Sequence, residues 1–343
     1  MKVIYSELSK LHNPTKEFIS HNLIEYAESP DRMNVILEAL KWVENIEVTP
    51  PEEFDLSNIL KVHSTQYVNY LQNAYKEWVD AGLNKDGVMP DFFAVGKIRD
   101  KLITRSPIGH AGYYMTDLST MIVENSWIAI KTSAFSALTA AKYILKGEKS
   151  VFSLSRPPGH HAGYDYAGGY CFLNNAAIAA KYLQDNSDNE KSRVCILDID
   201  YHHGNGTQDV IKSQENILYV SIHGHPDNAY PYLVGFEEEN CDKILNFPLR
   251  SNIDNSTYFE VFKKAVSAIK KYNPKFLVVS YGVDTHEYES EDLGDFKLTT
   301  DFYGTLSSYL RDNLDIPILV VMEGGYKISV LGANVTNFIE QLI

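Results

Sequence analysis

The sequence predicts an α/β fold in which helices flank a central parallel sheet. Short, near-continuous apolar runs recur along the chain, and segments with helical periodicity separate most of them. Strands that helices cover on both faces have this composition, because neither face meets water. Since the chain shows no repeat, no low-complexity tract and no clear linker, we expect one domain spanning residues 1–343.

The predicted elements follow in chain order. Residues 3–5 could form a first strand, and apolar side chains at helical spacing follow in residues 33–43, 59–71 and 133–145. The five strongest strand predictions are residues 151–154, 194–197, 217–220, 276–279 and 318–321. Helical segments lie between most of these strands, at residues 176–183, 258–271 and 302–310.

Residues 82–112 interrupt this alternation. They carry five Gly and two Pro among charged and aromatic side chains, so we expect a long irregular insertion. Loops of that length usually carry function or belong to an interface. The segment is therefore a candidate contact between two subunits.

Composition narrows the class of protein. With 31 Lys and Arg against 45 Asp and Glu, the formal net charge is −14, which disfavours binding to nucleic acid or to an anionic membrane and suits a small cationic ligand. The three cysteines form no CxxC pair, which suits a reducing compartment. The N-terminus lacks an apolar signal sequence, and no apolar run is long enough to span a bilayer. We therefore expect a cytoplasmic protein.

Polar sequence follows four of the five predicted strands at the point where each strand ends. The four stretches are RPPGHH (156–161), DIDYHH (198–203), SYGVD (280–284) and MEGGY (322–326). The carboxyl ends of parallel strands meet at one edge of a sheet, and ligands of open α/β sheets bind there. We therefore expect the functional side chains to gather at that edge.

Three of these side chains form a candidate metal site. Asp200 and His202 are two residues apart after a predicted strand, so both can point at one ion, and Asp284 would arrive from another strand end. Two carboxylates and one imidazole leave an open position for water, as in a catalytic Zn²⁺ site. The oxygen-rich set also suits Fe²⁺ or Mn²⁺. The second histidine, His203, and the glycines that follow favour this reading over a turn that carries Asp and His by chance.

Other residues at the strand ends suit acid–base and electrostatic work. His160 and His161 are adjacent and point in different directions, which favours proton transfer over binding one metal together; a structural pair is the alternative. Phe172 follows two glycines and could line a pocket or belong to the core. Tyr326 follows a Gly-Gly turn, so its hydroxyl could stabilise an oxyanion, unless the side chain lies in solvent.

The motifs together resemble the arginase/deacetylase-fold zinc hydrolases, which include the histone deacetylases, and most closely the acetylpolyamine amidohydrolases. The resemblance covers almost the whole chain. It rests on RPPGHHAG (156–163), GGYCFLNNAAIAA (168–180), LDIDYHHGNGTQ (197–208), SIHGHP (221–226), YGVDT (281–285), DFKLT (295–299) and VVMEGGY (320–326). The N-terminal residues 3–17 and 60–71 are also similar.

The resemblance implies a single-domain deacetylase-like fold with the active site at the carboxyl ends of the strands. By position it implies that the metal ligands are Asp200, His202 and Asp284. It implies that His161 acts as general base and then general acid, with His160 as its electrostatic partner.

The resemblance also implies supporting roles. Asp198 and Asn205 match groups that hydrogen-bond the two histidines, and Tyr326 matches the tyrosine that polarises the acetyl carbonyl together with the metal. A structural K⁺ site is implied, partly through backbone oxygens, at Asp198, Asp200, His202, Ser221 and Ile222.

Substrate recognition follows from the same comparison. Phe172 and Tyr230 match aromatic walls of the acyl tunnel, Gly169 lets the backbone approach closely, and Glu17 matches an acidic residue of the polyamine site. Asp117 and the acidic residues 287–295, a segment about two residues longer than usual in this family, could hold a distal ammonium group; a solvated charge run is the alternative for that segment.

The expected function is therefore zinc-dependent deacetylation of small acetylated amines such as acetylputrescine, acetylcadaverine and acetylspermidine, with release of acetate and free amine. Deacetylation of acetyl-lysine in proteins is the alternative. A binuclear manganese ureohydrolase would need more Asp and His ligands, and a silent acyl-lysine-binding module would not need Tyr326 with both histidines. The resemblance also implies a homodimer, with residues 82–112 at the interface.

Overall fold

The computed structural model describes residues 1–19, 22–96, 99, 102–187, 192–290 and 292–343. Within this part of the chain, eight strands form one sheet in the order β4-β1-β5-β10-β9-β6-β7-β8, and every neighbouring pair is parallel. The strands are β1 (Lys2–Ile4), β4 (Glu47–Thr49), β5 (Ser150–Ser153), β6 (Val194–Asp198), β7 (Ile217–Gly224), β8 (Ile244–Leu249), β9 (Phe276–Tyr281) and β10 (Ile318–Met322).

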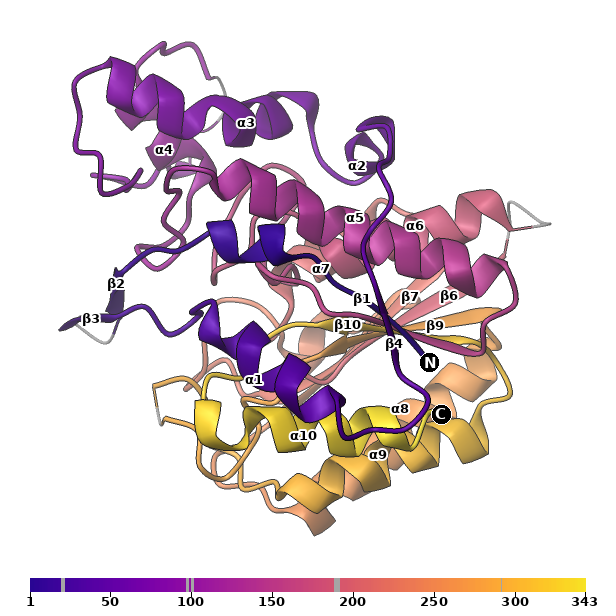
Figure 1. Ribbon diagram of the computed structural model, residues 1–343. Coiled ribbons are helices and arrows are strands. Elements are labelled where there is room, and N and C mark those ends of the chain that lie inside the picture. The colour runs from indigo at the N-terminus through magenta and orange to yellow at the C-terminus, as the bar shows by residue number, and fades with distance from the viewer. Residues whose placement is uncertain (20–21, 97–98, 100–101, 188–191, 291) are drawn as a thin grey trace.

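Helices cover both faces of this sheet (Figure 1). One face carries α1 (Asp31–Leu40), α8 (Asn255–Tyr272), α9 (Thr300–Asn313) and α10 (Ile328–Glu340). The other face carries α2 (Ser57–Leu60), α3 (Thr65–Asp80), α4 (Pro107–Tyr114), α5 (Ser126–Leu145), α6 (Asn175–Asn186) and α7 (Asn205–Lys212). Two 3₁₀ helices complete the set, η1 (Glu7–Leu11) and η3 (Glu237–Glu239).

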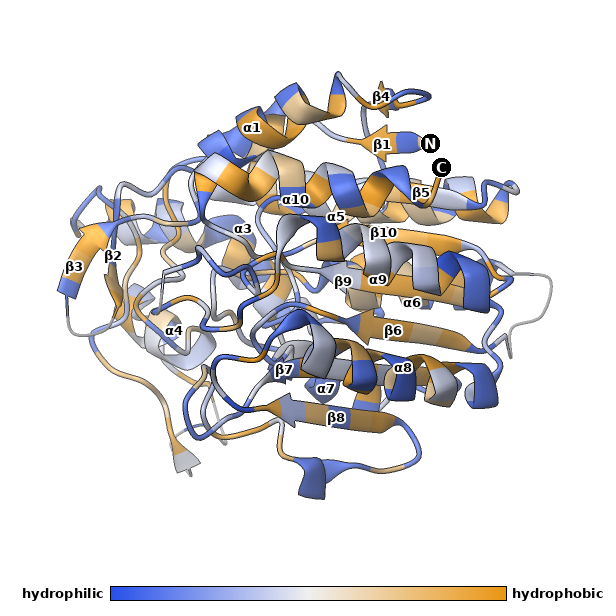
Figure 2. Ribbon diagram, turned by 90° about the horizontal axis from the view of Figure 1, so that it is seen from below, coloured by the Kyte–Doolittle hydropathy of each residue, from blue (hydrophilic) through white to orange (hydrophobic). Residues whose placement is uncertain are grey.

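Each central strand contributes to two hydrophobic cores. On β6, Ile196 packs in the core with α5 and α6, whereas its neighbour Leu197 packs in the core with α8 and α9. Val151 and Phe152 of β5 divide in the same way. Successive side chains of a strand point to opposite faces, so a strand covered on both sides needs an unbroken apolar run. This confirms the predicted parallel α/β fold, and Figure 2 shows the apolar strands directed toward one edge.

Several elements differ from the sequence prediction. The short edge strand β4, the outer strand β8 and helices α7 and α10 were not predicted; edge strands are short and half exposed, so their apolar signal is weak. A two-stranded antiparallel hairpin, β2 (Lys16–Ile19) with β3 (Asn22–Glu25), projects beyond the sheet at the side of α4 (Figure 1). The expected irregular segment 82–112 ends in α4; its residues 97–98 and 100–101 lie outside the described residues.

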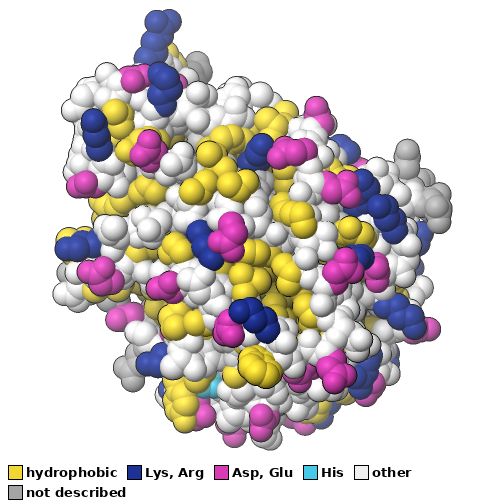
Figure 3. All heavy atoms as spheres, in the orientation of Figure 1, with side chains coloured by type: hydrophobic (Ala, Val, Ile, Leu, Met, Phe, Trp, Pro, Cys, Tyr) yellow, Lys and Arg dark blue, Asp and Glu magenta, His cyan; other side chains and the backbone are white. Residues whose placement is uncertain are grey.

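The surface carries charges of both signs. In the orientation of Figure 1, acidic and basic side chains are mixed among apolar ones (Figure 3). In the described part of the chain, no helix combines the length and the hydrophobicity that crossing a membrane requires. The polar stretches of the sequence lie at the carboxyl ends of β5, β6, β9 and β10, so a site is expected at that edge of the sheet.

Candidate active site

Asp200, His202 and Asp284 meet at the carboxyl edge of the sheet. The first two follow β6 and the third follows β9, and these strands are neighbours. Nδ1 of His202 lies 3.0 Å from Oδ2 of Asp284 and 3.3 Å from Oδ1 of Asp200. Ligand atoms about 2.1 Å from a tetrahedral zinc ion lie roughly 3.4 Å apart. The three side chains therefore have the spacing that one such ion requires.

Glycines allow these carboxylates to approach the backbone. A Cβ atom at Gly282 would lie 1.9 Å from Oδ2 of Asp200, and one at Gly324 would lie 2.6 Å from a carboxylate oxygen of both Asp200 and Asp284. The backbone N–H of Gly324 donates to Oδ2 of Asp200 over 2.8 Å. Gly282 and Gly324 are thus required by close packing around the candidate metal ligands.

The electrostatics of these three side chains favour a bound cation. All three are buried, with at most 8 % of the residue surface exposed. Burial, followed by the neighbouring Asp200 carboxylate, raises the pKa of Asp284 to about 7. Burial opposes the charged form of His202, but hydrogen bonds to Asp200 and Asp284 outweigh it and raise its pKa to about 9. Two buried carboxylates repel one another unless a positive charge lies between them, so the donor set fits a divalent cation.

The adjacent histidines follow β5 and face this set. Nδ1 of His160 lies 3.1 Å from Oδ2 of Asp198, and Nδ1 of His161 lies 2.6 Å from Oδ1 of Asn205. Burial would lower the pKa of His160, but the carboxylates of Asp200 and Asp198 overcome it and raise the pKa to about 10. Burial, then the positive charge of His160, lowers the pKa of His161 well below its usual range. These pKa shifts favour the charged form of the His160 ring and the neutral form of the His161 ring near pH 7.

Glu323 was not predicted as a site residue, yet it holds the histidine pair. Its Oε2 accepts the backbone N–H groups of Gly159 and His160 at 2.6 and 3.2 Å, and its Oε1 accepts the hydroxyl of Ser280 at 3.1 Å. The residue is completely buried. Its place in the EGGY stretch was visible in the sequence, but its contact lies 164 residues away in the chain.

Tyr326 lies on the loop between β10 and α10. Its ring centroid is 5.5 Å from that of Tyr170, and the guanidinium of Arg32 lies 5.1 Å from it. Burial raises the pKa of Tyr326 well above its usual value, so the phenol keeps its proton near pH 7. A neutral phenol in this position is a hydrogen-bond donor.

A pocket of approximately 550 Å³ opens next to these groups. It is lined by Phe18, Ile19, Asp117, Ser119, Gly169, Tyr170, Tyr230, Tyr232, Asp292 and Leu293. The ring of Tyr230 stands at 88° to that of His161, with centroids 4.8 Å apart. Gly169 has φ +52°, and a Cβ there would lie 2.2 Å from the His161 ring, so glycine is needed. The pocket therefore leads to the histidine pair, as the sequence predicted for Gly169 and Tyr230.

Phe172 was predicted to be a tunnel wall, but it is not among the residues that line this pocket. The residue is completely buried and belongs to the core, where its ring packs edge-on against His12. Tyr170 lines the pocket together with Tyr230. Tyr170 has φ +66°, a left-handed conformation that turns the chain directly after Gly169. Tyr170 directly follows Gly168 and Gly169, and this position was the signal in the sequence that could have identified it as the pocket wall.

Glu17 also lies elsewhere than its predicted role requires. It is completely buried on β2, outside the set of residues that line the pocket. Its Oε1 accepts the backbone N–H of Ala27 at 2.7 Å, and among the described residues its Oε2 has no hydrogen-bond partner. Burial raises the pKa of Glu17 to about 7. Glu17 thus lies behind the pocket wall, close enough to Tyr170 to raise the pKa of that phenol further.

Asp117 lines the pocket, but its carboxylate already has partners. Oδ2 accepts the N–H of Gly169 at 2.5 Å and the hydroxyl of Tyr230 at 3.1 Å. Oδ1 accepts the N–H groups of Ser119 and Thr120 at 3.1 and 2.9 Å. Asp117 therefore fixes the pocket wall in place.

The acidic segment 287–295 divides between two roles. Asp292 and Leu293 line the pocket, whereas Glu289 contacts the Tyr326 loop and Asp295 accepts the hydroxyl of Tyr201 at 2.9 Å. Residue 291 lies outside the described residues. The segment is therefore more than a solvated charge run.

Two of the residues predicted for K⁺, Asp200 and His202, are also candidate metal ligands, and the other three lie on the neighbouring strands β6 and β7. Asp198 and Ser221 are register partners on the neighbouring strands β6 and β7, and both are completely buried with Ile222. Oδ2 of Asp198 also accepts the hydroxyl of Tyr219 at 2.9 Å. The structure thus brings all five predicted residues to one region.

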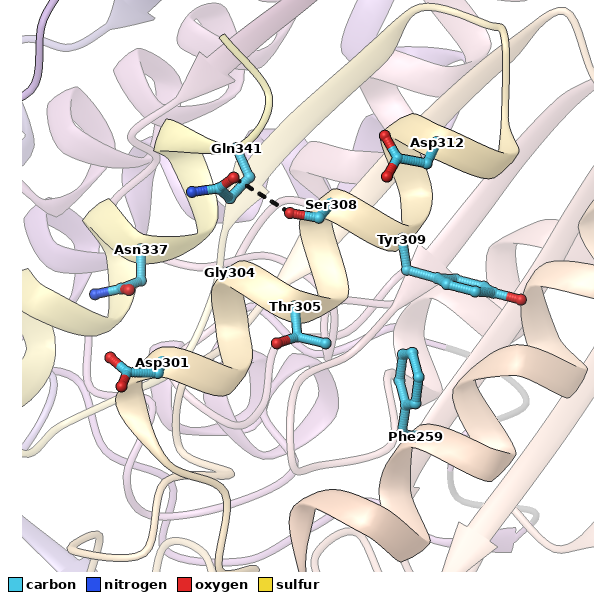
Figure 4. A pocket seen from close by; sticks show the side chains of 9 residues that line it. All are labelled: Phe259, Asp301, Gly304, Thr305, Ser308, Tyr309, Asp312, Asn337 and Gln341. Atoms are coloured by element: carbon cyan, nitrogen blue, oxygen red, sulfur yellow. Dashed lines mark hydrogen bonds between the residues drawn. The ribbon is translucent and has the colours of Figure 1, made fainter.

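A second depression in the surface lacks the features of an active site. It is a groove of approximately 420 Å³ over α8, α9 and α10, lined by residues such as Phe259, Asp301, Tyr309 and Gln341 (Figure 4). Its side chains spread apart, with one hydrogen bond drawn between Ser308 and Gln341. The groove holds neither of the two clusters of potential metal ligands found in the described residues.

The parallel sheet and the buried Asp–His–Asp set define a class, the α/β enzymes that bind a metal ion at the carboxyl edge of a sheet. Residues 26–342 match the family model of the histone deacetylase domain, and the chain belongs to that family. It is 37% identical to acetylpolyamine amidohydrolase 2 of Pseudomonas aeruginosa (99% of this chain, 98% of the relative) and 37% identical to the acetylpolyamine amidohydrolase of Mycoplana ramosa (99% of each chain).

A solved structure supports the same relationship. The acetylpolyamine aminohydrolase from Burkholderia pseudomallei, in a crystal soaked with iodide, superposes with a TM-score of 0.92 at 32% identity, covering 100% of this chain and 98% of that one. The family and the fold that the sequence predicted are both confirmed.

Proposed function

We propose that this chain is a zinc-dependent deacetylase that hydrolyses small acetylated amines to acetate and free amine. One observation carries the proposal: two adjacent buried histidines, His160 and His161, lie beside a buried Asp–His–Asp set at the end of an aromatic pocket. General base, positive charge and metal site are the parts that amide hydrolysis requires. The names of the relatives support acetylated polyamines as the substrate class.

Asp200, His202 and Asp284 would hold the metal ion. When bound, a divalent cation supplies a Lewis acid that polarises the acetyl carbonyl and acidifies water. The spacing suits Zn²⁺, and Fe²⁺ or Mn²⁺ are the alternatives that its oxygen ligands allow.

His161 is the general base in this proposal. Asn205 accepts its Nδ1–H, which leaves the Nε2 lone pair free to take a proton from the attacking water. The low pKa of His161 keeps that lone pair available near pH 7. Once protonated, the same ring can return the proton to the nitrogen of the leaving amine, so one residue serves both steps.

Tyr326 and His160 stabilise charge. The phenol of Tyr326 keeps its proton and donates a hydrogen bond to the oxyanion that forms on the acetyl carbon. His160 stays cationic because Asp198 and Asp200 surround it. Tyr170 and Tyr230 are walls that hold a linear acetylamidoalkyl chain, with Asp292 at the pocket lining as the acidic group for a distal ammonium.

Three further parts of the proposal concern the whole protein. We assign the enzyme to the cytoplasm, which its three free cysteines support. A structural K⁺ at Asp198, Asp200, His202, Ser221 and Ile222 is supported by their common burial. A homodimer through residues 82–112 is supported by exposed apolar side chains there, including Val95 and Ile103.

A kinetic panel with measured metal content tests the function. Acetylcadaverine should have a higher kcat/KM than the same chain ending in a methyl group, and the difference should shrink as salt rises. Asp284→Ala should lose metal and activity together. Full metal occupancy in that variant would contradict the ligand assignment, and a preference for acetyl-lysine peptides over acetylated diamines would favour the protein deacetylase instead.

A further inference from the structure

Tyr326 is attached to a stretch of backbone that has little stiffness of its own. The stretch Glu323–Tyr326 leaves β10 and enters α10, and it contains two consecutive glycines. Gly325 has φ +113°, a conformation that is strained for other residues. An oxyanion donor must be held in place to be effective. Contacts from other segments must therefore position the tyrosine.

Two of those contacts hold the loop upstream of Tyr326. Arg32 of α1 donates to the carbonyl oxygens of Glu323 and Gly325 over 2.6 and 2.7 Å. Asp200 accepts the N–H of Gly324. Neither contact reaches the backbone N–H of Tyr326.

Glu289 provides the contact at Tyr326 itself. Its Oε2 accepts the backbone N–H of Tyr326 at 2.7 Å and that of Lys327 at 3.1 Å. Lys327 is the N-cap of α10, and its own side chain makes no capping hydrogen bond. A carboxylate at this position satisfies N–H groups that the helix leaves without partners, and it faces the positive end of the helix dipole.

The same short segment carries Glu289 and a candidate metal ligand. Glu289 follows Asp284 by five residues, and the backbone between them is folded: the N–H of Glu289 donates to the carbonyl of His286 over 3.0 Å. A Cβ at Gly294 would lie 3.5 Å from Cγ of Glu289, so the side chain packs against the end of its own loop. The loop thus connects the metal site to the oxyanion donor.

We propose that Glu289 is a positioning residue, which fixes the backbone of Tyr326 relative to Asp284 and so sets kcat. The inference rests on the proposed deacetylase function. The Glu289 side chain does not touch the substrate; it acts through Tyr326. The carboxylate has the length and the two-fold acceptor capacity that both N–H groups require.

Glu289→Ala is the decisive variant, and Glu287→Ala is its matched control. Glu287 lies in the same segment and has the same charge, but it is not among the residues that line the pocket, and no hydrogen bond of its carboxylate is found among the described residues. Glu289→Ala should lower kcat about 10- to 100-fold, because a displacement near 1 Å can have that effect. KM and bound zinc should stay close to those of the unmodified enzyme, Glu287→Ala should keep full kcat, and Glu289→Gln, which retains an acceptor oxygen, should recover part of the loss.

A double variant separates positioning from a merely structural role. In the Tyr326→Phe background the donor is already absent, so adding Glu289→Ala should lower kcat less than about twofold. Independent multiplication of the two losses, loss of zinc in Glu289→Ala, or equal kcat in the Glu289→Ala and Glu287→Ala variants would each overturn the inference while the unmodified enzyme stays active. An unmodified enzyme that hydrolyses no acetylated amine would overturn the proposed function, and the inference with it.

Discussion

Burial and neighbouring charges give the residues of the candidate site different protonation states. His160 and His161 are adjacent and equally buried, yet carboxylates surround the first, whereas the second faces an amide and two imidazoles. Tyr326 is held as a neutral phenol. These pKa shifts favour one cation, one neutral base and one neutral donor beside the pocket, which is the combination that amide hydrolysis needs near neutral pH.

Tyr326→Phe tests the donor. The substitution removes the hydroxyl and leaves the ring against Tyr170 and Arg32, so the fold and bound metal should remain. The loss of one oxyanion donor should lower kcat about 10²- to 10³-fold. Steady-state kinetics would measure kcat, and elemental analysis would measure the bound metal. Near-normal turnover would remove Tyr326 from the mechanism.

Tyr170 and Phe172 should respond differently to the same substitution, leucine. Tyr170→Leu alters the pocket wall, so kcat/KM should fall by about tenfold or more. Phe172→Leu alters the core, so unfolding free energy should fall by roughly 1 kcal/mol or more while kcat/KM stays within about twofold. Thermal unfolding and kinetics on both variants decide the assignment. The reverse pattern would restore Phe172 as the wall.

At the scale of elements, two N-terminal segments pack against the site: helix α1 and the hairpin β2–β3. In α1, Arg32 pairs with Glu28 over 2.6 Å, and Glu28 also lies 2.9 Å from Nε of Arg156 at the start of the RPPGHH stretch. All three residues are completely buried. The hairpin β2–β3 adds Glu17 behind Tyr170. Both segments precede the sheet's central strands in sequence. The hairpin lines the pocket through Phe18 and Ile19, and α1 contacts the Tyr326 loop through Arg32.

Glu17 gives the hairpin a testable pH dependence. Its pKa is raised from 4.5 to about 7, so the folded state favours the protonated carboxyl. The stabilisation is complete below about pH 4.5 and is lost as pH rises through 7. Glu17→Gln stays neutral, so its melting temperature should exceed that of the unmodified chain increasingly between pH 5 and 8. The corresponding difference in unfolding free energy is at most about 3.4 kcal/mol.

The exposed Glu25 on the partner strand is the control for this prediction. Glu25→Gln removes one charge from the same hairpin, and the side chain lies in solvent. Its melting-temperature difference should stay constant over the same pH range. A constant difference for Glu17→Gln as well would show that Glu17 is not held in its protonated form.

At the scale of the whole molecule, the insertion 82–112 presents apolar side chains outward. Val95 is 66% exposed and Ile103 is 80% exposed. Large apolar side chains that stay exposed together often mark an interface. They are the strongest support for the proposed homodimer.

Ile103→Asp should therefore convert a dimer to a monomer. Burying a charge at an apolar interface opposes association. Trp42→Asp is the control, because Trp42 is 84% exposed at the end of α1 and lies outside the insertion. Light scattering at micromolar concentration checks both variants. A monomeric unmodified chain with intact activity would refute the interface.

Much of the fold was predictable because its signals are local. An apolar run such as 194–197 is readable without knowing its neighbours, since burial on both faces needs every residue to be apolar. The edge strand β4 has exposed and intermediate residues only, so no such pattern marks it. The spacing of Asp200 and His202 is also local, and it predicted a set that the structure brings together with Asp284.

Other features depended on contacts between distant segments. An alternating strand would place residues 170 and 172 on the same side, but the positive φ of Gly169 and Tyr170 turns only the first toward the pocket. Glu17 reads as an ordinary acidic residue until the packing of β2 buries it. Glu289 lies in an acidic run, and only the fold shows which of its carboxylates meets the N–H of Tyr326.

The sequence by itself determined the parallel α/β fold, the family, and the candidate metal and histidine residues, because periodicity, short spacing and glycine placement express local geometry. The tertiary structure alone decided that Tyr170 forms the pocket wall, that Glu17 lies behind it and that Glu289 accepts a hydrogen bond from the backbone N–H of Tyr326. Those three outcomes depend on burial and on hydrogen bonds between segments that are far apart in the chain, and neither quantity is a property of any one stretch of residues.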